Sequence, residues 1–308
     1  MLKLSSSLLC RAALLLLTVS SSVLAQHTVM DSRGEQVLDS IPQRVAALNW
    51  DIAEQVIELG IAPIAMPDIK GYNEWVVKPA VPAETQDIGT RVEPNYAALR
   101  ALKPDVIIIA SPQKDLESRL SQIAPVLYYQ TFSEQHNNAQ AAITNFKHIA
   151  QALGKTEEAE SKITFMNERI EQLNIALDSA FSGNKPHVSS FRFASTTSVY
   201  LYGGNSIPQY ALEKLGFEAA IEKPDTQWGI TQVRITELSQ IGNNIALYFE
   251  PLEQKEQLER SVIWQNMPFV KAQKVNAVEP VWSYGGAMSI LYNAEAIAAA
   301  LLEVAHTQ

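Results

Sequence analysis

Short apolar runs alternate with segments of helical periodicity along both halves of the chain. Residues 45–50, ending on Trp50, and residues 106–110 are apolar and of strand length. Residues 51–60 begin with a capping aspartate and stop at a glycine, as a helix does. The second half repeats this alternation up to a last strand over 275–282. Strand, helix and strand at this spacing predict βαβ units with mainly parallel sheets.

A different pattern fills the middle of the chain, where residues 156–181 form 26 positions without glycine or proline. Apolar residues recur there at steps of four and three, one stripe of an α-helix: Ala159, Ile163, Met166, Ile170, Leu173 and Leu177. At 1.5 Å per residue this helix is ~39 Å long, enough to lie across two lobes. The alternative, a coiled-coil seam, is weak because partner charges are missing. We therefore predict an N-terminal α/β lobe over 26–155, a connecting helix over 156–181 and a C-terminal α/β lobe over 182–308.

Residues 1–25 have the layout of an export signal. Lys3 and Arg11 are their only charges. Residues 12–19 are strongly apolar, and small residues end the segment at Ala25. We expect cleavage after Ala25; the alternative is an uncleaved signal anchor, for which the apolar region is short. The mature chain would then have no membrane span. It would also lose the only cysteine, and with it any thiol or disulfide chemistry.

Composition and charge narrow the function classes. The 308 residues leave room for two domains, and 47% apolar against 19% charged residues predicts packed cores. Lysine and arginine number 24 against 33 acidic residues, a net charge of −9. Because nucleic-acid binders need a basic face, we expect no nucleic-acid partner.

Common catalytic and metal-binding motifs are missing from the sequence. It contains no GxSxG, HExxH or CxxC, and no GxGxxG after a strand. The segment 154–156 resembles the end of a phosphate-binding loop, but Ile149 stands where that loop needs glycine. No two of the five histidines are spaced i, i+4, which argues against an imidazole metal site. We expect no enzyme and no metal ligands; an exported hydrolase or metal-dependent enzyme remains the alternative.

What remains is a set of aromatic and cationic side chains at turns and strand ends. The set comprises Trp50, Trp75, Arg91, Arg192, Trp228, Trp282 and Tyr284. In open α/β folds ligands bind beyond the carboxyl ends of strands, and aromatics gathered there suit a large, partly apolar ligand. The alternative for each tryptophan is ordinary packing. Arg192 interrupts an apolar strand, and its alternative is pairing with a nearby acid.

Several segments resemble one family. They are RVAALNWDIAEQVIELGIAPIA, DIGTRVEPNYAALRALKPDVIIIA, LSQIAPVL, IWQNMPFVKAQKVNAVEPVW and PVWSYGG, spread from about residue 44 to residue 302. Together they are similar to the periplasmic ferric-siderophore binding proteins of ABC importers. The combination of GTRVEPN, a tryptophan loop near residue 228 and PVWSYGG resembles the ferric-hydroxamate (ferrichrome) branch.

The resemblance implies a class III periplasmic binding protein: two α/β lobes, one long connecting helix, a shallow cleft and little hinge motion. It implies a monomer in the periplasm that hands ferric siderophore to an inner-membrane ABC permease. It implies no cofactor, since iron is bound only as a siderophore complex.

The resemblance also implies roles for individual residues. Arg91 matches an arginine that bonds the hydroxamate oxygens around Fe(III). The implied aromatic contacts are Trp50 and Trp75 in the first lobe and Trp228, Trp282 and Tyr284 in the second. Gln113 stands where the family has a cleft tyrosine. Arg192 is an addition that would favour an anionic complex, so ferric catecholate, ferric carboxylate, haem or cobalamin remain alternative ligands.

Permease docking in this family uses one acidic residue on each lobe. Glu117 and Glu237 are the nearest candidates. Each lies one position from the aligned family acid, where Ser118 and Thr236 stand. One step along a helix turns a side chain by ~100°, so these two acids would point in a different direction from the family's docking acids. The alternative is that both are ordinary solvated surface residues.

Overall fold

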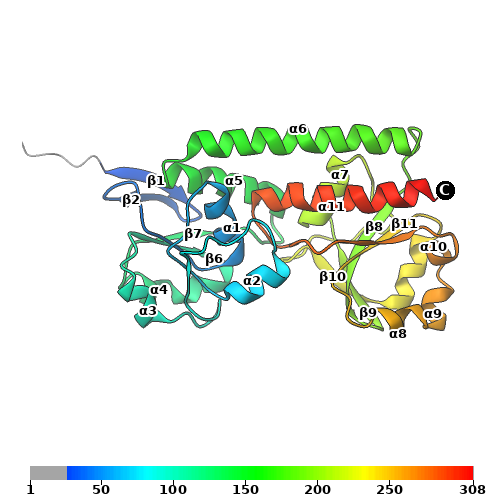
Figure 1. The fold of residues 1–308 in the computed structure, drawn as a ribbon, viewed down its shortest axis with the longest axis horizontal. Coiled ribbons are helices and arrows are strands. Elements are labelled where there is room, and N and C mark those ends of the chain that lie inside the picture. Colours follow the sequence, from blue (N-terminus) through cyan, green and yellow to red (C-terminus); the bar gives the residue numbers. More distant parts are fainter. Residues whose placement is uncertain (1–25, 308) are drawn as a thin grey trace, which may run out of the picture.

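Two five-stranded sheets, one in each half of the chain, form the centres of two lobes (Figure 1). The computed structural model describes residues 26–307. The expected signal peptide, residues 1–25, lies outside the described residues. The two-lobed α/β architecture predicted from the sequence is confirmed.

The first lobe holds a parallel sheet in the order β5-β4-β3-β6-β7. Its strands are β3 (Val45–Ala47), β4 (Ala65–Met66), β5 (Gln86–Asp87), β6 (Val106–Ala110) and β7 (Val126–Tyr129). An antiparallel hairpin that the apolar pattern missed, β1 (His27–Asp31) and β2 (Gly34–Leu38), precedes it. The helical segments are α1 (Trp50–Glu58), α2 (Ile69–Trp75), α3 (Tyr96–Ala101), η1 (Ser111–Leu116), α4 (Glu117–Leu120) and α5 (Asn138–Ala152).

The second lobe holds a mixed sheet in the order β10-β9-β8-β11-β12. Its strands are β8 (Val188–Ser195), β9 (Ser198–Tyr202), β10 (Ile230–Arg234), β11 (Ile245–Phe249) and β12 (Val275–Val278). β8, β11 and β12 are parallel, whereas β8–β9 and β9–β10 are antiparallel. The two-residue connection from β8 to β9 permits only an antiparallel pair. The helical segments are α7 (Ile207–Lys214), η2 (Ile235–Ile241), α8 (Lys255–Glu259), α9 (Val262–Gln265), α10 (Pro268–Lys271) and α11 (Ala287–His306).

Two predicted boundaries move, and both affect the position of aromatic residues. Trp50 does not end a strand but begins α1, with Asn49 in extended conformation as the N-cap. The last strand ends at Val278 instead of residue 282. Pro280 follows two residues later and has no N–H for a ladder, which explains the early end. Trp282 therefore lies in the loop between β12 and α11.

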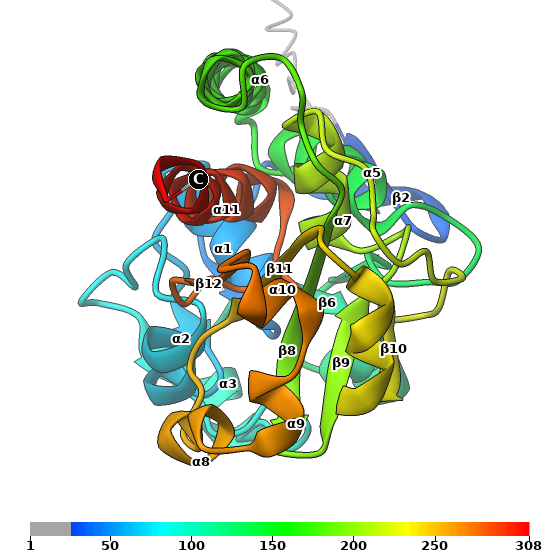
Figure 2. The ribbon, with the colours of Figure 1, turned by 90° about the vertical axis from the view of Figure 1, so that its right-hand side faces the viewer.

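Helix α6 (Thr156–Ala180) is the predicted long helix, one residue shorter than expected. It spans both lobes and lies on the outside of α11 (Figures 1 and 2). Its predicted stripe is divided between two cores. Ala159 packs in the core of the first lobe, and Met166, Ile170 and Leu177 pack in the core of the second. One helix thus completes both lobes.

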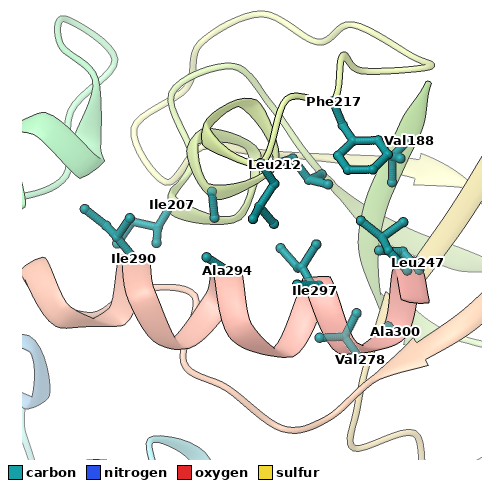
Figure 3. Packing of buried hydrophobic residues seen from close by; sticks show 14 of the residues in the cluster. Val188, Ile207, Leu212, Phe217, Leu247, Val278, Ile290, Ala294, Ile297 and Ala300 are labelled. Carbon is teal, nitrogen blue, oxygen red and sulfur yellow. The ribbon is translucent and has the colours of Figure 1, made fainter. Parts of the chain in front are cut away.

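The core of the second lobe is built around α11 (Figure 3). Ile290, Ala294 and Ile297 of α11 face Ile207 and Leu212 of α7. By length and apolar composition α11 could cross a membrane, but 67% of its apolar stretch is buried in the protein. That burial is typical of the core helix of a globular lobe.

The two lobes are joined at the N-terminus of α11 by a buried carboxyl group from α1. Glu54 accepts hydrogen bonds from Gly286 N (3.0 Å), Ser289 N (2.9 Å) and Ser289 Oγ (2.6 Å). The first turn of a helix leaves backbone N–H groups unpaired, and the oxygens of a carboxyl group can accept from them. Gly286, the N-cap of α11, has no side chain for this task. Helix α11 is therefore capped by the opposite lobe.

A glycine pair makes this close approach possible. A Cβ on Gly285 would lie 1.8 Å from Ser289 Oγ and 2.3 Å from Glu54 Oε2. A Cβ on Gly286 would lie 2.3 Å from Gln55 Cγ. The two glycines of the YGG motif are therefore needed because any side chain there would clash at the contact between the lobes.

Burial of Glu54 predicts a pH-dependent stability. Burial raises the pKa of Glu54 from 4.5 to about 8, and hydrogen bonds from Ser289 and Gly286 oppose this rise. The folded protein therefore holds a proton that the unfolded chain releases between these pH values. We expect the free energy of unfolding to fall as pH rises from about 5 to 8, by at most about 1.4 kcal/mol per pH unit for one such group. Urea unfolding at several pH values checks this.

The matched variant for that experiment is Glu54→Gln, which cannot titrate. The slope of stability against pH should become shallower in this variant. Asp51, whose pKa burial raises to about 6, would still contribute below that pH. Equal slopes in the two proteins between pH 6 and 8 would contradict the interpretation.

The glycine pair gives a second prediction. Gly285→Ala should lower the free energy of unfolding by about 1–3 kcal/mol, since the added methyl overpacks the lobe junction. Gly204→Ala is the control, because its Cβ would meet only the Asp225 carboxylate, at 3.1 Å. Thermal or urea unfolding of both variants provides the comparison. Similar stability of the two would argue against a tight junction.

Candidate ligand-binding cleft

Two neighbouring cavities lie between the lobes and share one wall. The smaller has a volume of about 260 Å³ and the larger about 520 Å³. The shared wall is formed by Trp50, Arg91, Arg192, Trp282 and Tyr284. Both lobes supply residues to it, so we treat the two cavities as compartments of one cleft.

Aromatic rings form a continuous chain across this cleft. Trp50 of the first lobe contacts Trp282 of the second with ring centroids 5.3 Å apart. Trp282 is followed by Tyr284 at 5.4 Å and then Trp228 at 6.1 Å. Phe132 completes the chain, 5.5 Å from Trp228 and 6.0 Å from Tyr284. Edge-on contacts predominate, which is the preferred geometry of aromatic pairs.

The first-lobe residues follow the carboxyl ends of parallel strands. The chain runs outward from β3 to β4 and β5 on one side, and resumes at β6 on the other. This reversal of strand order is where open α/β sheets bind ligands. Trp50 lies three residues after the end of β3, and its Nε1 donates to the Pro67 carbonyl (3.2 Å). Arg91 lies in the loop after β5.

Arg91 lies on the face of Trp50. Its guanidinium carbon is 3.7 Å from the centre of the Trp50 ring, a cation–π contact. Burial lowers the pKa of Arg91, and the charges of Asp68 and Asp51 oppose this shift. Among residues 26–307, no carboxylate lies within 4.0 Å of its guanidinium. Its donors are thus available to an acceptor in the cleft.

Gln113 does not line the cleft, contrary to the expectation. The residue is 0% exposed. Its Nε2 donates to the Arg91 carbonyl (3.1 Å) and its Oε1 accepts from Ala110 N (3.3 Å). The physical reason is that η1 begins immediately after β6 and turns this amide inward. Gln113 supports the loop of Arg91 from behind.

Trp228 is presented by a tight turn of the second lobe. Thr226 closes the turn: its Oγ1 donates to the Ile230 carbonyl and accepts from Ile230 N, both at 3.0 Å. Gly229 has φ +66°, and a Cβ there would lie 2.7 Å from Ser206. Asn205 Nδ2 donates to the Thr226 carbonyl (2.8 Å) and to the carbonyl of Ser133 in the first lobe (2.9 Å). The indole is therefore held against the lobe junction, yet 39% of Trp228 is exposed.

Trp282 and Tyr284 belong to the loop that leads into α11. Asn293 Nδ2 donates to the Trp282 carbonyl (3.0 Å), and Ser283 Oγ bonds Tyr202 OH (2.5 Å). Trp282 Nε1 and Tyr284 OH are buried, and neither has a hydrogen-bond partner within residues 26–307. Burial raises the pKa of Tyr284, while the charge of Arg192 opposes the rise. Tyr284 is therefore a neutral donor near neutral pH.

Arg192 lies in the shared wall and has no acidic partner. Its guanidinium carbon is 4.5 Å from the Tyr200 ring centre and 5.9 Å from that of Tyr284. No carboxylate of the described chain lies within ion-pair distance of it. Pairing with a nearby acid, the alternative for this residue, is not observed.

Trp75 occupies the rim of the cleft. It ends α2, is 41% exposed and lines only the smaller cavity. The structure thus brings all expected aromatic residues and both arginines to one cleft. Sequence reasoning missed Phe132, which lies three residues after β7. Applying the strand-end rule to β7 as well would have found it.

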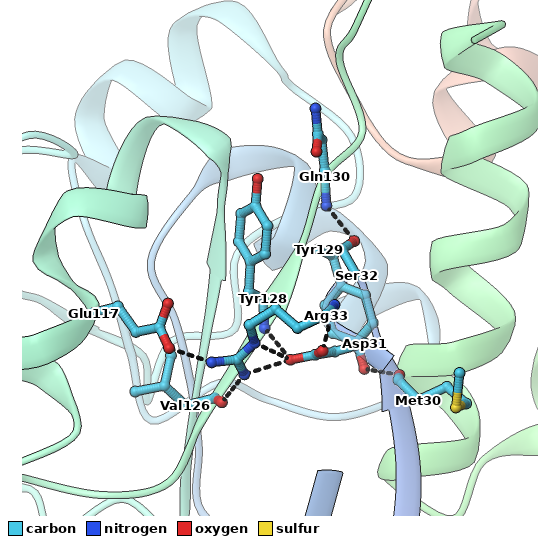
Figure 4. Close-up of polar contacts among 9 residues, drawn as sticks. All are labelled: Met30, Asp31, Ser32, Arg33, Glu117, Val126, Tyr128, Tyr129 and Gln130. Carbon is cyan, nitrogen blue, oxygen red and sulfur yellow. Dashed lines mark hydrogen bonds and ion pairs between the residues drawn. The ribbon is translucent and has the colours of Figure 1, made fainter. Parts of the chain in front are cut away.

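The expected docking acids lie apart from this cleft. Glu117 is already ion-paired with Arg33, which also contacts Asp31 and donates to the Val126 carbonyl (2.7 Å; Figure 4). Although partial burial opposes it, the charges of Asp31 and Glu117 raise the pKa of Arg33. Glu237 accepts from Arg234 N (3.1 Å) and is half-buried. Their docking role stays a prediction.

Carboxylate, imidazole and thiolate groups do not gather anywhere in the described chain. Within residues 26–307, no group of three or more such side chains is placed to hold a metal ion. What the cleft offers instead is aromatic surface, two guanidinium groups, and the N–H and O–H donors of Trp282 and Tyr284 in its wall.

An aromatic cleft between two bridged α/β lobes is the architecture of a solute-binding protein. The chain belongs to the periplasmic binding protein family, whose model matches residues 45–280. The family resemblance read from the sequence motifs is thereby confirmed.

Individual relatives are informative. The chain is 27% identical over 253 residues to the iron(3+)-hydroxamate-binding protein FhuD of Escherichia coli, covering 82% of this chain and 84% of the relative. It is also 27% identical over 264 residues to the Fe(3+)-citrate-binding protein YfmC of Bacillus subtilis, covering 83% and 80%. Among solved structures, Fe3+-Desferal-bound FhuD of Vibrio cholerae is 50% identical, with a TM-score of 0.84, covering 85% of this chain and 98% of that chain.

The support of Arg91 by Gln113 yields a stability prediction. Gln113→Ala should lower the free energy of unfolding by about 1–3 kcal/mol, because the Arg91 carbonyl and Ala110 N–H lose their partner. Gln151→Ala, on the exposed side of α5, is the control and should change stability by less than about 0.5 kcal/mol. Urea unfolding measures both. A neutral Gln113→Ala would show that the amide is not needed there.

Proposed function

We propose that this protein binds ferric hydroxamate siderophores and passes them to an ABC permease. The observation that carries the proposal is the shared wall of the cleft, where Arg91 lies on Trp50 beside the rings of Trp282 and Tyr284. A ferric tris-hydroxamate has an oxygen-rich iron centre and an apolar backbone. A guanidinium is a charge-assisted donor for those oxygens, and aromatic faces pack on the backbone.

The relatives support the same ligand class. The Vibrio cholerae FhuD structure contains Fe3+-Desferal, and the Escherichia coli FhuD is named for hydroxamate binding. Under this proposal Trp50, Trp75, Trp228, Trp282 and Tyr284 contact the ligand, and Arg91 bonds the oxygens around iron. Iron arrives already chelated, so the protein needs no metal ligands of its own and no catalytic group.

A second candidate, a ferric carboxylate complex, is favoured by one observation. Arg192 adds a second cation that has no carboxylate within ion-pair distance among residues 26–307. The Bacillus subtilis relative that is named for Fe(3+)-citrate has the same 27% identity as the Escherichia coli protein. The 50% identity to Vibrio cholerae FhuD places hydroxamates first.

The remaining parts of the proposal concern export and delivery. The signal at residues 1–25 would direct the chain to the periplasm, where it would act as a monomer. Delivery to the permease would use acidic surface residues, with Glu117 and Glu237 as candidates. Because Glu117 is ion-paired with Arg33, docking through it would require exchange of that pair for a permease cation.

Tryptophan fluorescence of the mature chain tests the ligand class. Titration with ferrichrome and ferrioxamine should give saturable quenching at micromolar concentrations or below, since four tryptophans line the cleft. Ferric citrate and a ferric catecholate should bind more weakly. Arg91→Ala and Trp228→Ala should each raise the Kd for ferrichrome about tenfold or more.

Matched controls are available for both substitutions. Trp264→Phe changes a buried tryptophan that packs on Phe269 and Phe193 and does not itself line either cavity. Arg260→Ala removes an exposed arginine. Both should keep the wild-type Kd. Absence of binding by any iron complex would overturn the proposal, and binding of the anionic complexes alone would move the ligand to the second candidate.

A further inference from the structure

Arg192 is a cation that the protein itself does not neutralise. It lies in the middle of the second sheet, paired in register with Tyr200 on β9 and Phe249 on β11. Its Nε is buried and has no hydrogen-bond acceptor among the described residues. The rings of Tyr200 and Tyr284 are its neighbours, at 4.5 and 5.9 Å. An aromatic face offsets only part of the free energy of removing a guanidinium from water.

The two carboxylates that line the cleft interact with groups other than Arg192. Glu250 lines the smaller cavity, but it pairs with Lys255 at 3.5 Å. Asp68 lines the larger cavity, where its Oδ1 accepts from Gly71 N (3.1 Å) and its charge favours the protonated form of Arg91. Each of these acids thus has a cation near it. Arg192, in contrast, lines both cavities and has no ion-pair partner in the part of the chain that the structure describes.

The two compartments allow a ligand with two different ends. The larger cavity, lined by Trp228, Phe132 and Arg91, has room for a chelate with its apolar backbone. The smaller cavity extends from the shared wall past Arg192 toward Phe193, Phe249 and Val281. A guanidinium presents paired N–H donors that match a carboxylate better than a neutral amide. The second compartment is therefore suited to an acidic arm.

We propose that Arg192 anchors a subsite for a carboxylate carried by the ligand, separate from the groups that chelate iron. The inference rests on the proposed function and narrows it: the preferred ligands are ferric hydroxamates that also bear a free carboxylate. Arg91 then bonds the hydroxamate oxygens around iron, and Arg192 bonds the carboxylate. Selectivity between charged and neutral chelates is set by Arg192.

A matched pair of chelates tests this subsite. The free amine of Desferal is acylated with either a succinyl group, which ends in a carboxylate, or an acetyl group, which does not. Both are loaded with Fe(III), and each Kd is measured by tryptophan quenching. The mature wild-type protein should bind the succinyl chelate about tenfold more tightly than the acetyl chelate. The ratio should fall at high salt, because the contact is between charges.

Variants separate the subsite from the iron end of the ligand. Arg192→Gln should bring the Kd ratio of the two chelates close to one. Arg192→Lys keeps the charge without the planar fork and should keep part of the ratio. Arg91→Gln should weaken both chelates alike and leave the ratio near its wild-type value. Because a ratio is measured, loss of overall affinity in a variant does not imitate the expected result.

The outcomes are distinguishable. If wild type binds both chelates with equal Kd, or if Arg192→Gln keeps the wild-type ratio, the carboxylate subsite is wrong while hydroxamate binding stands. If wild type binds neither chelate nor ferrichrome, the proposed function fails, and the subsite fails with it.

Discussion

The arrangement of the two lobes depends on one buried carboxyl group. The side chain of Glu54 extends from the first lobe and accepts three hydrogen bonds at the first turn of α11 in the second lobe. The same helix α1 begins with Trp50, and the glycine pair that receives Glu54 directly follows Tyr284. The contact that joins the lobes is therefore only a few residues from the aromatic contact that crosses the cleft. Any change in the joint would alter the spacing of Trp50 and Trp282.

A second connection supports the other side of the cleft. Asn205 bonds both the turn of Trp228 and the first-lobe segment that carries Phe132. Glu58 extends the α1 connection to Lys162 of α6 at 2.7 Å and to Tyr292 of α11. The cleft is thus framed by polar contacts between lobes on two sides. Contacts of this kind hold the aromatic wall in place, and a site that is ordered in advance lowers the ordering cost of binding.

Sequence patterns predicted the elements whose signals are local. The apolar stripe predicted α6 to within one residue, and the β-branched run predicted β6 with the bounds that the structure has. The placement of Gln113 could not be predicted, because a residue after a buried strand can point to the cleft or away from it. The turn of η1 decides this, and a 3-10 turn leaves no periodic signal. The role of Glu54 could not be predicted either. Its partners Gly286 and Ser289 lie 232 and 235 positions further along the chain, and no local pattern connects residues so far apart.

Helix α6 has a consequence for recombining this protein with its relatives. It gives Ala159 to the first core and Met166, Ile170 and Leu177 to the second. A chimera that takes one lobe from a homologue would inherit a helix fitted to two different surfaces. A crossover at either end of α6 would leave one core with a foreign face, and one between Ala159 and Met166 would fall at Ile163, which packs against both cores. Exchanging cleft side chains therefore disturbs the two cores less than exchanging a whole lobe.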